Sequence, residues 1–194
     1  MLQYLVLLGA VVNLAGGLFY IKETLKGKTK PNKVTWLMWA ISPFIATAAA
    51  LSAGVGWAVL PVFMAGFVPF LVFVASFINP KSYWQLEKFD YLCGACSILA
   101  LILWAITRQP LVAIIFSIAS DGFAALPTII KSWKKPKTES VQAYITGTFN
   151  ALTSFFALKT FGLSEIAFPI YLVLVNLTTT IVIYRGKLKK IFTK

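Results

Sequence analysis

Seven long apolar stretches, separated by short polar breaks, dominate the pattern of hydrophobic and polar positions along the chain. A helix that crosses the hydrocarbon core of a bilayer needs about 20 mainly apolar residues. Seven windows meet this requirement, at residues 2–22, 33–53, 57–78, 90–107, 110–131, 140–158 and 164–184. Turn-forming pairs such as Asn79-Pro80 and Lys135-Pro136 occupy the breaks. The pattern predicts an all-α integral membrane protein with seven transmembrane helices.

Composition agrees with this prediction and excludes several classes of protein. Of the 194 residues, 59% are hydrophobic, 12% are charged and two are cysteines. An average soluble domain carries about 25% charged residues, a disordered chain is more polar, and a secreted disulfide scaffold has more cysteines. Seven spans leave only about 54 residues for loops and tails, so no extramembrane domain fits. We expect the first window to be a retained span, because no basic segment precedes it.

The basic residues are distributed unevenly over the predicted loops. The chain has 18 Lys and Arg against 6 Asp and Glu, a net charge of +12. If the seven spans alternate in direction, only Arg108 and Lys159 fall on one side of the membrane. The other 16 share the opposite side: Lys22, Lys26, Lys28, Lys30, Lys33, Lys81, Lys88, Lys131, Lys134, Lys135, Lys137, Arg185, Lys187, Lys189, Lys190 and Lys194.

Short loops rich in Lys and Arg stay in the cytoplasm. The charge distribution therefore predicts a multi-pass protein of the cell membrane, with its N-terminus outside and its C-terminus cytoplasmic. It also predicts contact with anionic lipids at the cytoplasmic face. Because this one-sided distribution accounts for the basic charge, we expect no nucleic-acid partner.

The chain contains a weak internal repeat. A shift of 107 positions places window 33–53 on 140–160, and a shift of 108 positions places the first window on the fifth. In the second and sixth windows, the helix face of Trp39, Pro43, Ala46, Thr47 and Ala50 falls on Thr146, Asn150, Thr153, Ser154 and Ala157. In the first and fifth windows, Gly9, Asn13, Gly16, Gly17 and Tyr20 fall on Ser117, Asp121, Ala124, Ala125 and Thr128. Chance similarity among seven apolar peaks is the alternative interpretation.

The repeat predicts a three-one-three arrangement of helices. Three spans reverse the chain direction across the membrane, so one extra helix is needed before a second copy can run parallel to the first. We expect a first three-helix bundle at residues 1–79, a loop and linker helix at 80–108, and a second three-helix bundle with a basic tail at 109–194. In parallel repeats of this kind the substrate site lies near the midplane, between the two halves.

The stretch from Leu126 to Ser140 resembles the PQ-loop motif. In that motif Pro-Gln ends a helix, a short basic loop follows, and a Ser-Thr-Glu-Gly-like element opens the next helix. Pro127 stands at the proline, Thr128 replaces the glutamine, and Thr138-Glu139-Ser140 resembles the last element.

The PQ-loop superfamily includes the SWEET sugar transporters and the PQ-loop amino-acid transporters, and the vitamin-importing PnuC family shares its three-one-three plan. The resemblance implies a distant member of this superfamily. It implies a transporter that moves a small polar solute, such as a sugar, an amino acid or a vitamin-like compound, by alternating access. Prolines inside membrane helices allow bending, so we expect Pro43 and Pro127 to be hinges, with a static kink as the alternative.

Asp121 is the only acidic residue well inside a predicted span. An ionised Asp at the centre of a membrane helix costs about 2.5–3.5 kcal/mol on insertion scales, and such residues usually mark substrate or proton paths. Its helix face is otherwise small or polar, with Ser117, Ala124, Ala125 and Thr128. We predict that Asp121 binds substrate or couples transport to protons. A structural hydrogen bond between helices is the alternative.

Deep amides and one tryptophan complete the predicted site. Amide side chains suit a polar neutral solute, although they also hold membrane helices together. Trp39 lies on the repeated face and can stack on a ring substrate. With Asp121, the predicted substrate-binding or proton-coupling residues are Asn13, Ser117, Trp39, Thr146, Asn150 and Asn176. The expected interfacial anchors are Trp36, Trp57, Trp84 and Trp133.

Three classes of function compete for this sequence: a solute carrier, a membrane-embedded enzyme, and a receptor or scaffold. With no His and one deep carboxylate, acid–base or metal chemistry is hard to assemble. The Cys93-Gly94-Ala95-Cys96 sequence is expected to pack helices rather than to hold a metal or a redox disulfide. We predict a carrier working by facilitated diffusion or linked to protons, without catalytic activity, cofactor or metal. The alternative is a non-transporting receptor or scaffold of similar fold. A homo-oligomer is compatible with the sequence but not required.

Overall fold

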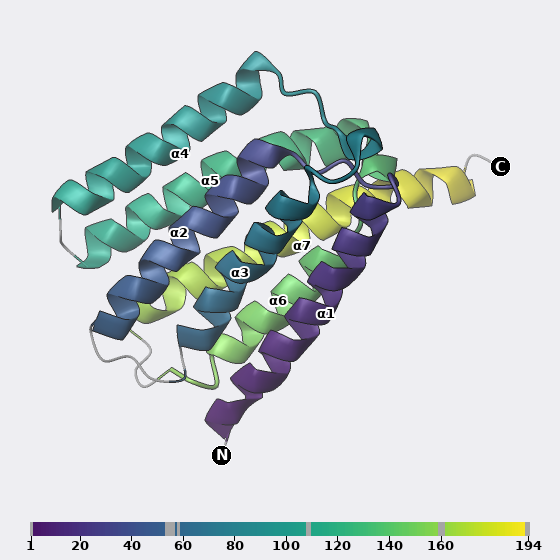
Figure 1. Cartoon of the computed structure of the whole chain (residues 1–194). Helices are drawn as coiled ribbons and strands as arrows, with labels where there is room; N and C mark the ends of the chain where they lie inside the picture. The colour runs from purple at the N-terminus through teal and green to yellow at the C-terminus, as the bar shows by residue number, and fades with distance from the viewer. Residues whose placement is uncertain (1, 53–56, 58, 108–109, 159–161, 193–194) are drawn as a thin grey trace.

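The computed structural model describes residues 2–52, 57, 59–107, 110–158 and 162–192. Its α-helices are α1 (Leu5–Leu25), α2 (Lys33–Ser52), α3 (Val59–Ala75), α4 (Lys88–Thr107), α5 (Pro110–Lys134), α6 (Gln142–Ser154) and α7 (Leu163–Phe192). Short 3-10 turns lie at Leu2–Tyr4, Pro80–Ser82 and Pro136–Thr138 (Figure 1). Within the described residues there is no strand. The predicted all-α class and the seven helices in their predicted order are confirmed.

The sixth and seventh helices differ in length from their predicted windows. Helix α6 has 13 residues, against a predicted window of 140–158. Its chain tightens into three-residue turns after Ser154, where Phe156 N donates to Thr153 O and Ala157 N donates to Ser154 O. Helix α7 instead continues past residue 184 to Phe192. The Lys-rich tail favours this extension, since lysine is a good helix former and its charge suits a helix C-terminus.

Helix composition separates the outside of the bundle from its inside. Three helical segments are long and apolar enough to cross a membrane, Leu5–Leu25, Lys88–Thr107 and Ile166–Arg185, and Val59–Ala75 is apolar but shorter. Large apolar side chains face outward: Val11, Ile106 and Ile181 are 66–71% exposed. Polar side chains are buried instead, including Asn13, Ser97, Ser120, Asp121, Thr128, Asn150 and Thr179. This is the reverse of the distribution in a water-soluble domain.

The helices pack in a regular pattern. Helix α3 packs against both α1 and α2, and α7 packs against both α5 and α6. Contacts of α1 with α6 and of α2 with α5 join these two sets of helices. Helix α4 lies along one edge of the bundle, where it contacts α5 and α2 (Figure 1).

Three connecting segments gather at one end of the bundle, together with the C-terminal end of α7 (Figure 1). They are the segments between α1 and α2, between α3 and α4, and between α5 and α6. Lys30 N donates to Thr138 O at 2.8 Å, and Asn79 Nδ2 donates to Leu25 O at 2.7 Å, so these segments bind one another. Their described lysines lead us to call this end the basic end. Arg108 and Lys159, predicted for the other side, lie outside the described residues.

Helices α1 and α6 approach closely through small residues. A Cβ atom placed on Gly9 or Gly16 of α1 would overlap the side chain of Thr153 or Thr146 of α6. Small residues at helix contacts allow this approach in membrane proteins. Gly9 and Gly16 are thus required by packing between the two sets of helices.

Candidate functional site

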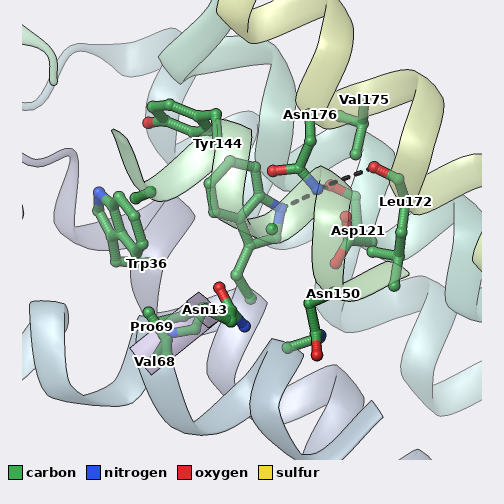
Figure 2. A pocket seen from close by; sticks show the side chains of 14 residues that line it. Asn13, Trp36, Val68, Pro69, Asp121, Tyr144, Asn150, Leu172, Val175 and Asn176 are labelled. Carbon is green, nitrogen blue, oxygen red and sulfur yellow. Dashed lines mark hydrogen bonds between the residues drawn. The ribbon is translucent and has the colours of Figure 1, made fainter. Parts of the chain in front are cut away.

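A cavity of about 60 Å³ lies among the helices (Figure 2). Every helix except α4 contributes to its described lining. The lining residues are Asn13, Trp36, Trp39, Ala65, Val68, Pro69, Asp121, Ala143, Tyr144, Gly147, Asn150, Leu172, Val175 and Asn176. Five predicted site residues, Asn13, Trp39, Asp121, Asn150 and Asn176, therefore meet at one cavity.

Asp121 is held in the cavity by neutral hydrogen-bond donors. Its side chain is almost fully buried, with the residue 3% exposed. The hydroxyl of Tyr171 on α7 donates to Asp121 Oδ2 at 2.7 Å, and Trp39 Nε1 on α2 donates to the backbone oxygen of Asp121 at 3.3 Å. Among the described lining residues there is no basic side chain. The Asp121 carboxyl group is consequently the one acidic group of the lining and has no cationic neighbour there.

Three amides surround the same space, and each uses its nitrogen for a helix carbonyl. Asn13 Nδ2 donates to Met64 O at 3.4 Å, and Asn150 Nδ2 donates to Pro61 O at 3.0 Å, both on α3. Asn176 Nδ2 donates to Leu172 O at 2.8 Å within α7. The buried oxygen Oδ1 of Asn150 has no hydrogen-bond partner among the described residues. The amide nitrogens therefore bond to helix carbonyls, and Asn150 Oδ1 is an acceptor without a partner among the described residues.

An aromatic layer covers the cavity on the side of the basic end. The layer consists of Tyr20, Trp36, Trp39 and Tyr144. Trp36 and Tyr144 each contact the other three rings, with centroids 4.9 Å apart for Tyr20 and Trp36 and 5.4 Å apart for Trp36 and Trp39. The prediction that Trp36 is an interfacial anchor is wrong, because its side chain is 2% exposed and lines the cavity. Its position just inside α2 led to that prediction, but the ring turns inward onto Tyr20. Trp57 and Trp133 are half exposed, at 50% and 55%.

A buried ion pair lies beyond the aromatic layer. Lys131 at the end of α5 pairs with Glu139, which precedes α6. The hydroxyls of Tyr20 and Tyr144 donate to Glu139 Oε2 at 2.7 and 3.0 Å, and Lys131 Nζ donates to the backbone oxygen of Lys30 at 2.5 Å. We call these residues the basic-end lock, because they join α1, the α1–α2 segment, α5 and α6. Lys131 was expected among the loop charges, yet it is buried, since Glu139 and a loop carbonyl satisfy its ammonium group.

Two predicted site residues lie outside the cavity lining. Thr146 donates to the backbone oxygens of Gln142 and Ala143 in its own helix and faces Gly16, so its place is the contact between α1 and α6. Ser117 is buried but does not line the cavity. The sequence pattern places Ser117 on the helix face of Asp121 and Thr146 on the helix face of Asn150. Periodicity shows which residues share a face, but it does not show which other helix that face contacts.

Prolines occur inside four of the helices: Pro43 in α2, Pro69 in α3, Pro127 in α5 and Pro169 in α7. The predicted hinges Pro43 and Pro127 are therefore within helices, and neither lines the cavity. Pro69 does line the cavity. It lies 107 positions before Asn176 and was not among the predicted site residues. The peptide bond to a proline at such positions leaves a carbonyl of the preceding turn without its usual donor.

The two cysteines belong to helix packing and not to the cavity. Cys93 is buried, and both cysteines are free thiols. Ser97, one turn further along α4, donates to Cys93 O at 2.9 Å and to Ser120 O of α5 at 2.7 Å. Among the described residues there is no cluster of three or more His, Cys, Asp or Glu that could hold a metal ion.

The cavity lining consists largely of residue pairs separated by 107 or 108 positions. Five such pairs occur among the 14 lining residues: Asn13 and Asp121, Trp36 and Ala143, Ala65 and Leu172, Val68 and Val175, and Pro69 and Asn176. Hydrogen bonds follow the same spacing. Asn13 bonds to Met64, while Asp121 bonds to Tyr171, so both ends of the second bond lie one repeat shift after those of the first.

No protein-family model, curated protein or solved structure matches this chain. Evidence on function therefore comes from the fold and from the cavity. The features that bear on it are a small, mainly apolar cavity that contains one carboxyl group and three amides, lining positions paired at a spacing of 107 or 108, and a buried ion pair at the basic end.

Proposed function

We propose that this protein is a multi-pass membrane carrier that moves a small polar solute by alternating access. In this proposal the moving parts are two three-helix halves, α1–α3 and α5–α7, and α4 is the linker helix between them. The main support for the proposal is the cavity. Six helices line it, and ten of its 14 lining residues form pairs separated by 107 or 108 positions. A solute site between two parallel repeats is the arrangement expected of such carriers.

Contacts between the proposed halves join corresponding pairs of helices, α1 with α6 and α5 with α2, which supports the repeat. Tyr20 in α1 donates to Glu139 before α6, and Thr128 in α5 donates to Thr35 in α2 at 3.0 Å. Thr128 is the repeat mate of Tyr20. In the proposed halves α1 corresponds to α5, and α2 corresponds to α6. The contact of α1 with α6 therefore corresponds to the contact of α5 with α2, as expected for two halves related by a two-fold axis.

A location in the membrane is supported by the distribution of side chains. Polar groups are buried, large apolar side chains face outward, and three helical segments are long and apolar enough to span a bilayer. Segments carrying most of the described lysines lie together at the basic end (Figure 1). Under the positive-inside rule this end is cytoplasmic, with the C-terminus on the same side.

Alternating access requires that the cavity open at one end while it is closed at the other. The aromatic layer and the basic-end lock separate the cavity from the basic end. Along α1, Asn13, Tyr20 and Lys26 follow in order from the cavity to the basic end. We assign this conformation to a state closed on the cytoplasmic side, from which opening must part Tyr20 and Glu139.

A transport assay that works for an unidentified solute tests the proposal. Purified protein is reconstituted into liposomes loaded with a mixture of small amines, polyols, amino acids and nucleosides, and retained solutes are measured by mass spectrometry after dilution. We expect at least one chemical class to be lost faster than from protein-free liposomes. Asp121→Asn should reduce that loss, whereas Glu23→Gln, which removes a partly buried carboxylate outside the cavity lining that pairs with the exposed Lys28, should not.

Equal retention of every solute in the protein-containing and protein-free liposomes would contradict transport. Binding of a solute to the purified protein together with such equal retention would instead favour a receptor or scaffold of the same fold.

A further inference from the structure

We propose that the cavity binds a small primary ammonium ion, recognised through its N–H groups by Asp121, Asn150 and Asn176. The inference rests on the proposed function in taking the cavity as the solute site. Asp121 belongs to α5, Asn150 to α6 and Asn176 to α7. In Figure 2 these three side chains lie on one side of the pocket and the rings of Trp36 and Tyr144 on the other.

The polar side of the cavity offers a ligand hydrogen-bond acceptors, all of them oxygen atoms. The nitrogens of Asn150 and Asn176 already donate to Pro61 O and Leu172 O, which leaves each Oδ1 as the group for a solute. Asn150 Oδ1 is buried without a partner among the described residues, a costly state for a polar atom. Asn176 Oδ1 lies against Gly147, where a Cβ would come within 2.9 Å of it. A ligand that donates hydrogen bonds would satisfy these oxygens.

Most donors around the cavity are already used. Trp39 Nε1 donates to Asp121 O, Tyr171 donates to Asp121 Oδ2, and the hydroxyl of Tyr144 donates to Glu139 outside the cavity. Trp36 Nε1 has no partner among the described residues, but it lies on the side of its ring away from Asp121 in Figure 2. A polyol such as a sugar needs donors as well as acceptors, so this lining suits it less than a ligand that only donates.

The charge of the lining also favours a cationic ligand. The lining holds one carboxyl group and, within the described residues, no Lys or Arg, so an anionic solute would meet repulsion and no counter-charge. A primary ammonium group has three donors and no acceptor, which matches one carboxylate and two amide oxygens. The faces of Trp36, Trp39 and Tyr144 add an aromatic wall of the kind that attracts cations.

Cavity size limits the ligand to a few heavy atoms in this conformation. About 60 Å³ is room for roughly four to six water molecules, at about 10–15 Å³ each on this measure. Ethylammonium and isopropylammonium are of this size. A compact amine is therefore the expected ligand class, and a disaccharide is too large.

Two isomeric cations test the inference on the wild-type protein. Isopropylammonium and trimethylammonium have the same charge and the same atoms, but the first has three N–H donors and the second has one. Binding to the purified protein in detergent is measured by calorimetry for both, with isopropanol and acetate as the neutral and anionic comparisons. Each lost hydrogen bond to a charged group costs about tenfold in affinity, so we expect isopropylammonium to bind at least about tenfold more tightly than trimethylammonium. Equal affinities, tighter binding of trimethylammonium, or no binding of either cation would overturn the inference.

Variants assign the binding to the cavity. Asp121→Asn keeps an acceptor for Tyr171 but removes the charge, and should weaken isopropylammonium binding at least about tenfold. Glu23→Gln is the matched control and should bind like the wild type. Unchanged binding by Asp121→Asn would place the cation elsewhere. If this variant does not fold, the two isomers on the wild-type protein still decide the question.

This experiment separates the inference from the proposed function, because it measures binding and not passage. Ammonium binding without loss of any solute from liposomes would support the ligand class and contradict the carrier. Loss of some other solute class without ammonium binding would support the carrier and contradict the ligand class.

Discussion

Glu139 carries a buried carboxylate at the basic end. Two tyrosine hydroxyls and one ammonium group reach its carboxylate, and both it and Lys131 are buried. Removal of one partner from a buried ion pair leaves the other charge without compensation, which typically costs about 3–5 kcal/mol. The basic-end lock should therefore matter more for stability than any single surface charge.

Glu139→Gln should destabilise the protein by about 3–5 kcal/mol, because the Lys131 ammonium then lies buried beside a neutral amide. The free energy of unfolding in detergent, followed by tryptophan fluorescence, measures this effect. The double variant Lys131→Met with Glu139→Gln removes both charges and should recover most of the loss. A Glu139→Gln variant as stable as the wild type would show that the ion pair is not needed for the fold.

At the scale of residues, the sequence predicted the polar members of the cavity better than their partners. Asp121 and the three amides stand out because polar groups are rare in apolar spans. Tyr171 does not stand out, since a tyrosine in an apolar helix is common and its partner Asp121 is 50 residues away. Glu139 and Lys131 looked like loop charges, because burial of a charged pair depends on which helix ends meet, and local sequence does not contain that information.

At the scale of elements, packing between α1 and α6 depends on glycines that leave room for threonines. Gly16→Ala places a methyl group on the Thr146 side chain. We expect a loss of about 1–3 kcal/mol in unfolding free energy, the usual cost of overpacking. Gly122→Ala is the matched control, since its nearest neighbour, the Tyr171 hydroxyl, is 3.7 Å away in ordinary contact. Adding Thr146→Ala should restore the stability of the Gly16→Ala variant. If stability is not restored, overlap with Thr146 is not the cause of the loss.

Prolines inside α2 and α5 provide a second test at this scale. Pro43→Ala and Pro127→Ala each restore a missing backbone donor, so the helices should become stiffer without loss of fold. If they are hinges, the rate of solute loss from liposomes should fall several-fold while binding affinity stays unchanged. Wild-type rates in both variants would identify the prolines as static kinks.

Helix positions followed closely from the hydrophobic pattern, and the exceptions have local causes. Apolar windows predict where a helix exists, but its end depends on capping and on turns that hydropathy does not register. Helix α6 therefore ends at Ser154, before its window does, in three-residue turns beside Thr153. Helix α7 runs past its window, because its basic tail is polar yet helix-forming.

At the scale of the whole molecule, the repeat shift connects sequence, packing and cavity. In the sequence, the predicted repeat rests on two faint helix faces. In the structure the same spacing relates the lining residues, and it relates the bond from Asn13 to Met64 with the bond from Asp121 to Tyr171. The contact of α1 with α6, by contrast, could not be predicted, because periodicity defines the faces of helices and not which faces meet.

The proposed carrier must expose one cavity to both sides of the membrane in turn. Ala65 lines the cavity and is small, so Ala65→Cys in a background of Cys93→Ser and Cys96→Ser places a single thiol there. The matched control keeps only the native Cys93, which is buried outside the cavity lining. A membrane-impermeant thiol reagent is added to sealed vesicles of known orientation, from either the outside or the inside.

The labelling of the thiol introduced by Ala65→Cys, from the two sides, is the most direct test of alternating access. We predict that the reagent labels this thiol from each side, that isopropylammonium slows the labelling from both, and that Cys93 in the control stays unlabelled. Labelling of the introduced thiol from one side only, under all conditions, would contradict the account.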